Sequence, residues 1–554
     1  MKRILFTLLT LTAIMLTAKA EDYKIISERD TTVKTRVGGV TLSSRGVRHY
    51  IYEYPSKDAD GQPVTISGVI MIPSNIMDGD APCDGIMLFN RATLGDPSDA
   101  PSMGNTELLN GLIANPLEPN YILIMSDFIG YGSSIDKPMF YHSGDVNARN
   151  SLDGLVAARK LLTDKEIPMG KYLFNLGFSE GGSESLYAAK LRDMEYKDKG
   201  ITFDKTFAGG GPTDYVIAYK EYVKRDWCED CKDVVMMMIS AVENLHLNID
   251  YKDLFKEPLA TGAKEYVKTK SKATLGEYGV SMEDSLHNLI QPEYMDLESD
   301  QAKAFMAALE KINLLNGWDI DPTQRYFIAH SRHDNYVPIQ CVRTIIPWMM
   351  EKGFKPSIVP GKTNLQTNTL VIKLDHTYMA IVWLIQTMAA IQVWPVIYYE
   401  GGQNRYYHDV VKDLNIMKVI KTLESWGIDL RKLVNISMAP QLEKAYRTNR
   451  AGALALIMNF IPGVKDALAK VDLTPEDVEE MIYDAGITDE DIYQVIAYIL
   501  SGSSSAPQAD STLPLITLNE DVEAPVQLMR LYEQTLANWF MLGGINVEYE
   551  KWGW

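Results

Sequence analysis

Short apolar runs separated by turn residues dominate the first part of the chain. Residues 50–54 and 64–72 are rich in β-branched and aromatic side chains, and the turn-forming residues 58–61 lie between them. Residues 85–89 and 121–125 are compact apolar runs of the length that buried strands have. This pattern predicts a β-strand at each of the four apolar runs.

Strand-like and helix-like segments then alternate. A helical pattern around residues 153–162 is followed by an apolar run at 172–176, a helical stretch at 183–191 and a strand-like run at 205–208. Strands that alternate with helices build a mainly parallel sheet that is covered by helices. The sequence therefore predicts an α/β fold.

Residues 213–323 interrupt this alternation with a composition that favours helices. An insertion here would form a helical cap over the carboxyl edge of the sheet. Its methionine-rich run at 234–239 is adaptable, so it either contacts the substrate or packs the core of the cap. The sheet resumes at 325–330 and again at 369–374, before a long apolar helix at about 378–394.

The last part of the chain is mostly helical by composition and carries no residues with evident chemistry. Within it, the Ser-rich segment 501–511 has the composition of a flexible linker. We therefore predict four parts, which are a leader at 1–20, a sheet domain at 21–212 and 324–395, a helical cap at 213–323, and a helical extension at 396–554.

The first twenty residues have the features of a secretory signal peptide. Lys2 and Arg3 precede an apolar run from residue 4 to about 16, and residues 18–20 form a small-x-small cleavage site. The apolar run is too short for a spanning helix, and no later segment is long and apolar enough to cross a bilayer. We expect an exported, soluble protein that is periplasmic or extracellular.

Charge and cysteine content narrow the range of partners. The formal net charge is −19, and it becomes −22 once the leader with its three basic residues is removed. This charge argues against nucleic acid and anionic membrane surfaces. Cys228 and Cys231 form one Cys-x-x-Cys pair, which we interpret as a local disulfide or as two inert thiols. No His or Cys cluster completes a zinc site, so no metal is expected.

The motif Gly177-Phe-Ser179-Glu-Gly181 lies between the predicted strand at 172–176 and the predicted helix at 183–191. A serine on such a sharp turn has a strained backbone, and its flanking glycines are needed because a Cβ would clash there. The turn lifts the serine hydroxyl above the sheet. Ser179 is therefore the predicted nucleophile.

A serine hydroxyl needs a base, and the base needs a carboxylate that orients it. His376 follows the last predicted strand, at the carboxyl edge of the sheet, and is the predicted base. Asp334, in the loop after the preceding strand, is the predicted acid. The rivals are His330 and His333 for the base and Asp375 for the acid, whereas His246, His287 and His408 are expected to be ordinary helix residues.

The predicted oxyanion hole consists of backbone amides. One donor is the N–H of Glu180, which follows the nucleophile, and the second comes from the loop after the strand at 85–89, at Arg91 or Ala92. Arg91 could also bind a substrate carboxylate or form a salt bridge at the surface.

These segments together resemble the secreted lipase/esterase branch of the α/β-hydrolases, over about residues 45–395. The matching motifs are Gly61-Gln-Pro63, Gly68-Val-Ile-Met-Ile-Pro73, Asp99-Ala-Pro-Ser102, Asp127-Phe-Ile-Gly-Tyr-Gly132 and the serine motif with its second glycine, Gly182. The order Ser179, Asp334, His376 is also that of the family. Where the family usually has His-Gly-Thr, this chain has Arg91-Ala92-Thr93.

The resemblance implies an α/β-hydrolase fold and a serine hydrolase that cleaves carboxylic esters through an acyl-enzyme, without cofactor or metal. Its substrate would be a small-molecule ester or an acylated glycan. A peptidase of the prolyl oligopeptidase kind shares the fold and the triad. A binding protein on a hydrolase scaffold is the alternative outside enzymes. The sequence leaves the oligomeric state open.

Overall fold

The computed structural model describes eight ranges of the chain, which are 22–37, 40–104, 120–142, 144–281, 285–354, 356–357, 364–370 and 374–397. The predicted signal peptide and the Ser-rich segment lie outside them, and so does the predicted extension apart from residues 396 and 397. His408 lies outside them as well.

Ten strands form one sheet in this described part of the chain, in the order β1-β2-β3-β5-β4-β6-β7-β8-β10-β9. The first three strands and β5 pair antiparallel, and all further pairs are parallel. The strands are β1 (Lys24–Val37), β2 (Val40–Lys57), β3 (Pro63–Pro73), β4 (Gly85–Asn90), β5 (Tyr121–Ser126), β6 (Tyr172–Phe178), β7 (Lys205–Gly209), β8 (Tyr326–Ser331), β9 (Pro356–Ser357) and β10 (Leu365–Leu370).

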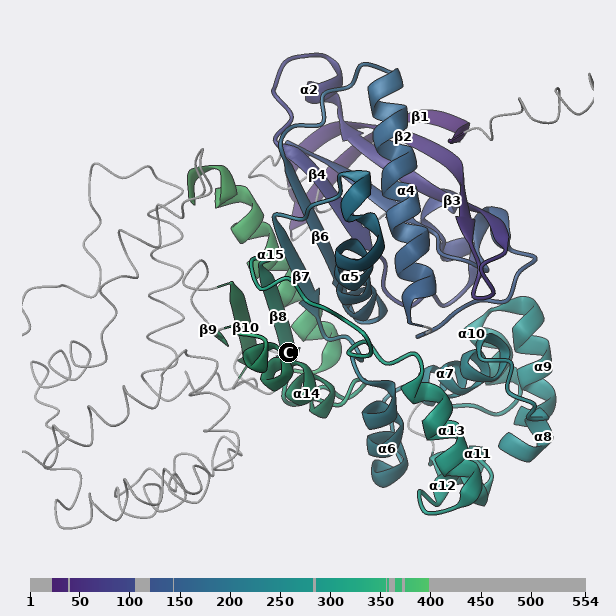
Figure 1. Ribbon diagram of the computed structural model, residues 1–554. Coiled ribbons are helices and arrows are strands. Elements are labelled where there is room, and N and C mark those ends of the chain that lie inside the picture. The colour runs from purple at the N-terminus through teal and green to yellow at the C-terminus, as the bar shows by residue number, and fades with distance from the viewer. Residues whose placement is uncertain are drawn as a thin grey trace, which may run out of the picture.

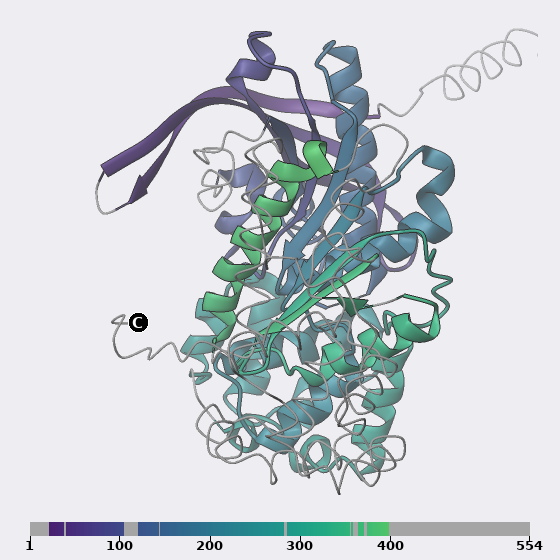
Figure 2. The ribbon, with the colours of Figure 1, turned by 90° about the vertical axis from the view of Figure 1, so that its left-hand side faces the viewer.

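The β1–β2 ribbon extends past the rest of the sheet (Figure 2). It does so because β3 pairs with β2 only from Val47 onward, whereas β1 follows β2 as far as Val40. The four central strands β4 to β7 instead have every residue buried, as expected of parallel strands covered on both faces.

Helices cover both faces of the sheet (Figure 1). Helices α4 (Asp145–Asp164) and α5 (Glu180–Leu191) lie on one face, and α15 (His376–Ile397) lies on the other. Buried Trp383 of α15 packs against Phe178 at the end of β6, with 5.6 Å between the ring centroids. No helix in the described ranges is long and apolar enough to cross a membrane.

Among the described residues, eight helices lie between β7 and β8, where the sequence predicts the insertion. They gather at one end of the sheet (Figure 1). They are α6 (Tyr215–Arg225), α7 (Cys231–Asn244), α8 (Tyr251–Leu254), α9 (Leu259–Thr269), α10 (Lys272–Glu277), α11 (Leu286–Leu289), α12 (Pro292–Met295) and α13 (Asp300–Glu310). Elsewhere lie α2 (Ser74–Met77), α14 (Gln340–Glu351) and short helical turns at Pro97–Asp99, Pro101–Met103, Gly132–Ser134, Arg192–Tyr196 and Lys197–Lys199.

Two predicted elements differ from the observed ones. The helix expected around 153–162 begins at Asp145, and the strand expected at 369–374 is β10, four residues earlier. The start of this strand was not predicted because Gln366 and Thr367 are polar and interrupt the apolar pattern. Both side chains are nevertheless buried, and Gln366 accepts a hydrogen bond from Lys205 Nζ at 2.7 Å. A buried polar pair between strands thus replaces the apolar pattern.

Candidate active site

Ser179 lies at the turn between β6 and α5, in a strained conformation with φ 59° and ψ −127°. It is the one residue between 172 and 189 that is not buried. A Cβ on Gly177 would lie 2.2 Å from the carbonyl oxygen of Gly181, and one on Gly181 would lie 2.0 Å from that of Asn90. Glycine is therefore required at both positions, and the turn presents the Ser179 side chain to solvent.

Asp334 and His376 meet at the carboxyl edge of the sheet. His376 Nδ1 lies 2.7 Å from Asp334 Oδ2, while Asp334 Oδ1 accepts from the backbone N–H groups of Tyr336 at 2.9 Å and Val337 at 2.7 Å. Burial raises the pKa of Asp334, but the charge and the hydrogen bond of His376 outweigh it, so that the pKa is lowered. Asp334 is therefore an anion that can orient the imidazole.

Two aromatic rings contact the imidazole of His376. Its centroid lies 4.9 Å from that of Phe178 and 5.1 Å from that of Tyr336. Because Phe178 immediately precedes Ser179, the ring lies beside the serine turn. The backbone N–H of His376 donates to Asn335 Oδ1 at 2.9 Å, which fixes the start of α15. The roles of Ser179, Asp334 and His376 remain predictions, although the structure brings their segments to one place.

The rival residues have other partners. Asp375 caps α15, because its Oδ1 accepts from the backbone N–H of Tyr378 at 2.9 Å. His330 is fully buried in β8, with Nε2 3.0 Å from Val337 O and 3.6 Å from Asp334 Oδ2, and burial lowers its pKa. His333 is half-buried in the loop, where its backbone N–H donates to Ser331 Oγ at 3.2 Å.

The histidines of the insertion lie at the surface. His246 Nε2 is 2.9 Å from Asp60 Oδ1, and His287 Nδ1 is 2.7 Å from Asp226 Oδ1. Both side chains are more than half exposed, at 65% and 60%. Exposed polar contacts of this kind contribute little and need no catalytic explanation.

Two of the three residues predicted for the oxyanion hole, Arg91 and Glu180, are joined by their side chains. Arg91 Nη1 lies 2.8 Å from Glu180 Oε2, and both residues are buried. Arg91 Nε–H also donates to the carbonyl of Asp127 at 3.0 Å, and its guanidinium carbon lies 4.4 Å and 4.8 Å from the ring centroids of Phe128 and Tyr131. The expected salt bridge of Arg91 is present, but the expectation that it lies at the surface is wrong, because both partners are buried.

A charged cluster joins the insertion to the loop after β4. Lys272 Nζ pairs with Asp233 and lies 3.2 Å from Asp230 Oδ2, while its backbone N–H donates to Gly95 O at 2.8 Å. Burial raises the pKa of Asp233 above its ordinary value, and the charge of Lys272 offsets only part of this rise. This cluster could not be predicted, because the spacing of Asp230, Asp233 and Lys272 in the sequence does not show that they meet.

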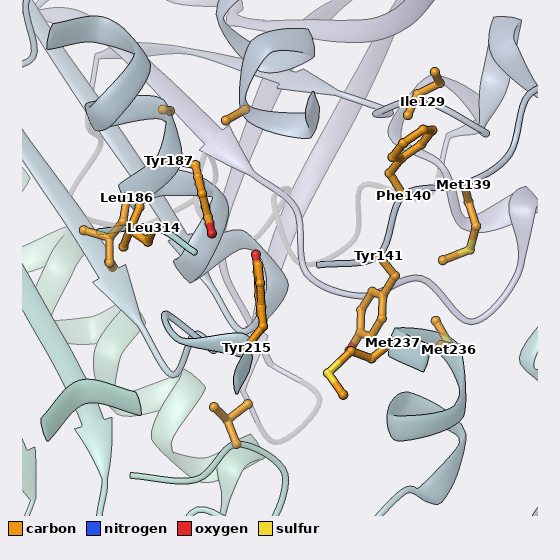
Figure 3. Packing of buried hydrophobic residues seen from close by; sticks show 14 of the residues in the cluster. Ile129, Met139, Phe140, Tyr141, Leu186, Tyr187, Tyr215, Met236, Met237 and Leu314 are labelled. Atoms are coloured by element: carbon orange, nitrogen blue, oxygen red, sulfur yellow. The ribbon is translucent and has the colours of Figure 1, made fainter. Parts of the chain in front are cut away.

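The methionine run of α7 packs inside the molecule. Met236, Met237 and Met238 are at most 2% exposed, and Figure 3 shows Met237 beside Tyr141. Of the two roles expected for the run, these positions favour core packing. Nothing in their placement supports direct contact with a substrate.

Cys228 and Cys231 are buried and are not disulfide-bonded, so of the two expected states the structure has the thiols. Cys228 Sγ lies 3.8 Å from the carbonyl oxygen of Tyr336, whose ring contacts that of His376. Burial raises the pKa of Cys228, which disfavours the reactive thiolate. Among the described residues, no three His, Cys, Asp or Glu side chains are placed to hold a metal ion.

Comparison with known proteins identifies the fold. No family model and no curated protein matches the chain. Among solved structures, a Legionella pneumophila protein named as a hydrolase is 17% identical, with a TM-score of 0.57 over 69% of this chain and all of that one. The rice cell wall degrading esterase LipA from Xanthomonas oryzae is 16% identical, with a TM-score of 0.53 over 68% of this chain and 97% of that one. The chain has the α/β-hydrolase fold.

Proposed function

We propose that the protein is a serine hydrolase that cleaves carboxylic esters through an acyl-enzyme on Ser179. One observation carries the proposal, which is the 2.7 Å contact between Asp334 and His376 beside the strained serine turn. A nucleophile, a base and an orienting acid are the three groups that this chemistry requires. The esterase named among the structural neighbours supports the same class of substrate.

In the proposed mechanism, Ser179 Oγ attacks the ester carbonyl while His376 Nε2 accepts its proton. Asp334 remains an anion and stabilises the imidazolium through Nδ1. The backbone N–H of Glu180 and that of Arg91 or Ala92 donate hydrogen bonds to the oxyanion. His376 then gives the proton to the leaving alcohol, and water hydrolyses the acyl-enzyme by the same steps. The substrate that we propose is a small-molecule ester or an acylated glycan.

A fluorophosphonate probe tests the nucleophile. It should form one covalent adduct, located on Ser179 by peptide mass spectrometry, and Ser179→Ala should remain unlabelled. An adduct on another serine would refute the assignment. A panel of short-chain esters, long-chain esters, acylated glycans and aminoacyl amides then separates an esterase from a peptidase. If protein that reacts with the probe turned over none of these substrates, a binding protein would be favoured.

We also propose that residues 1–20 are a leader that directs export, because two basic residues precede an apolar run and a small-x-small site. Expression of the full chain in a bacterial host, followed by intact-mass measurement of the periplasmic fraction, tests this. A mature N-terminus at Glu21 is the expected result. Full-length protein confined to the cytoplasm would contradict it.

A further inference from the structure

We infer that the buried ion pair between Arg91 and Glu180 positions the two backbone donors of the oxyanion hole. The inference rests on the proposed function, since it gives a role to the side chains of the residues whose backbones form that hole. The pair joins segments that are 89 residues apart, namely the end of β4 and the start of α5.

The backbones of these two segments touch directly. A Cβ on Gly181 would lie 2.0 Å from Asn90 O and 2.7 Å from Arg91 O, so nothing separates the start of α5 from the end of β4. Asn90 is itself fixed, because its Nδ2 donates to Asn175 Oδ1 at 2.9 Å and to Ser185 Oγ at 3.0 Å. A small shift of either segment would therefore change the distance between the two amides.

The guanidinium of Arg91 has more partners than an ion pair needs. Besides Glu180, it donates to the carbonyls of Asp127 at 3.0 Å and Ala92 at 3.1 Å, and it lies over the rings of Phe128 and Tyr131. A planar group held at each edge has one orientation only. It thus ties the loop after β4 to the loop after β5 and to the serine turn.

Stability alone does not explain the pair. Taking two charges out of water is costly, and replacing a buried pair by apolar residues of similar volume is often neutral or stabilising. Ala92, by contrast, is exposed beside the turn and offers no side-chain anchor for its own amide. The ion pair supplies that anchor from the neighbouring residue, at the place where the family usually has His-Gly-Thr.

The double variant Arg91→Met/Glu180→Leu tests this inference, because it removes both charges without leaving either one unpaired. We expect kcat to fall about 100-fold, the cost of a misplaced or missing oxyanion donor, with KM changed less than about threefold. The ratio of ester to matched thionoester turnover should also fall, because sulfur accepts hydrogen bonds poorly and gains little from an intact hole. A retained kcat and ratio would overturn the inference.

Arg192→Met/Asp193→Leu is the matched control. This ion pair is equally buried and lies at the other end of α5, with 2.7 Å between Arg192 Nη2 and Asp193 Oδ1. It should change the thermal midpoint by a similar amount while kcat and the thionoester ratio stay unchanged. An equal loss of kcat in the control would show a general effect of buried charge and would overturn the inference.

Arg91→Lys keeps the test decisive if the double variant does not fold. Lysine keeps the charge near Glu180 but loses the planar fork, so we expect a soluble enzyme with kcat lowered about tenfold and a reduced thionoester ratio. An unchanged ratio in Arg91→Lys would overturn the inference. Failure of the proposed function looks different, since the wild type would then lack any turnover that Ser179→Ala removes.

Discussion

The two sides of the candidate site are built in different ways. The nucleophile side consists of regular elements in direct backbone contact, where glycines leave no space for a side chain. The acid–base side consists of the loop after β8 and the first residue of α15, joined by hydrogen bonds between side chains and backbone. The first is fixed by packing, and the second is fixed by a few polar contacts.

This difference separates stability from catalysis. A hydrogen bond contributes about 1 kcal/mol, so the loss of one on the acid–base side should leave the fold intact. A side chain added on the nucleophile side would overlap backbone atoms. Its cost in stability should be larger than that of one hydrogen bond, because close-packed elements must move apart to relieve the overlap. The acid–base side also contacts the insertion, through the backbone N–H of Glu229, which donates to Asn335 O at 3.2 Å. Changes on the nucleophile side should therefore lower stability, whereas changes on the acid–base side should lower activity and leave stability nearly unchanged.

The largest effects on activity are expected at the triad itself. Ser179→Ala and His376→Ala should each lower kcat by roughly 10⁴-fold or more, because the members act as a unit, and Asp334→Asn should cost a factor of about 10⁴. Stability should change little in Ser179→Ala, since that side chain is half-exposed. Steady-state kinetics with a chromogenic ester measure the first effect, and thermal unfolding measures the second.

His333→Ala is the control for the base, and it should keep most of the activity. The backbone N–H of this half-buried loop histidine donates to Ser331 Oγ, whereas the contact with Asp334 Oδ2 at 2.7 Å is made by His376. His333 therefore has no role in the proposed mechanism. If His333→Ala lost activity while His376→Ala kept it, the base would be assigned to the wrong residue.

The largest effect on stability is expected on the nucleophile side, at Gly181. Gly181→Ala places a Cβ 2.0 Å from the backbone oxygen of Asn90, which cannot rotate away. We expect a loss of about 3 kcal/mol or more, in the range of severe overpacking. Urea unfolding and soluble yield measure it.

Gly276→Ala is the matched control. Its new Cβ would meet only the end of the Lys232 side chain at 3.7 Å, so the variant should gain a few tenths to about 1 kcal/mol from helix propensity. Equal stability of Gly181→Ala and the wild type would show that the serine turn tolerates displacement, and the comparison between the two sides would fail.

Acid should weaken the support of the nucleophile side first. His142 packs 3.9 Å from the ring of Tyr141 and 5.7 Å from that of Tyr215, which stacks on Tyr187 of α5 (Figure 3 shows the three tyrosines). Burial lowers the pKa of His142 to about 3. The unfolded chain takes up a proton below pH 6.5 while folded His142 stays neutral, so stability falls as the pH drops from 6.5 towards 3.

The expected loss between pH 6.5 and 4.5 is at most roughly 3 kcal/mol, at about 1.4 kcal/mol per pH unit. Asp334 should add nothing in this window. Its pKa is lowered by folding, so its contribution is present above its unfolded pKa and is lost only as the pH falls through the lower folded value. Urea unfolding at both pH values should show a smaller loss in His142→Asn, which accepts the positive φ of 52° at this position. An equal loss would exclude His142 as the cause.

The sequence predicted the fold and the approximate places of the site residues, because both depend on local signals. Apolar runs marked the strands, and the glycines of the serine motif marked the turn between β6 and α5. The meeting of Asp334 with His376 followed from one topological rule, that the carboxyl ends of parallel strands share one edge. The catalytic roles themselves stay predictions until activity is measured.

Other features could not be predicted, because they depend on contacts between distant segments. No local pattern shows that Arg91 would be buried against Glu180. Helix α14 contains Pro347, which the rules for helix interiors disfavour, and it was not predicted. Strand β10 was misplaced because its polar Gln366 finds a partner in Lys205 from another strand. Each of these depends on a partner that the local sequence does not contain.

The smallest expected effect concerns Asn335, and it tests the comparison most directly. Asn335→Ala removes the acceptor of the His376 backbone N–H, so the imidazole should lose part of its alignment with Asp334. We expect kcat to fall about tenfold, which corresponds to about 1.4 kcal/mol, with little change in the thermal midpoint. Asn335→Asp keeps an acceptor and adds a negative charge near His376, so activity should recover while the acid limb of kcat/KM moves to higher pH.

Ser299→Ala removes a hydrogen bond of the same kind at the start of α13, where Ser299 Oγ accepts from the backbone N–H of Ala302 at 3.0 Å. It should cost similar stability and leave kcat unchanged, because α13 carries none of the proposed catalytic residues. If Asn335→Ala behaved like Ser299→Ala, the polar contacts of the acid–base side would serve stability alone. A tenfold loss confined to Asn335→Ala, restored by aspartate with a shifted acid limb, requires instead that this side chain controls the imidazole.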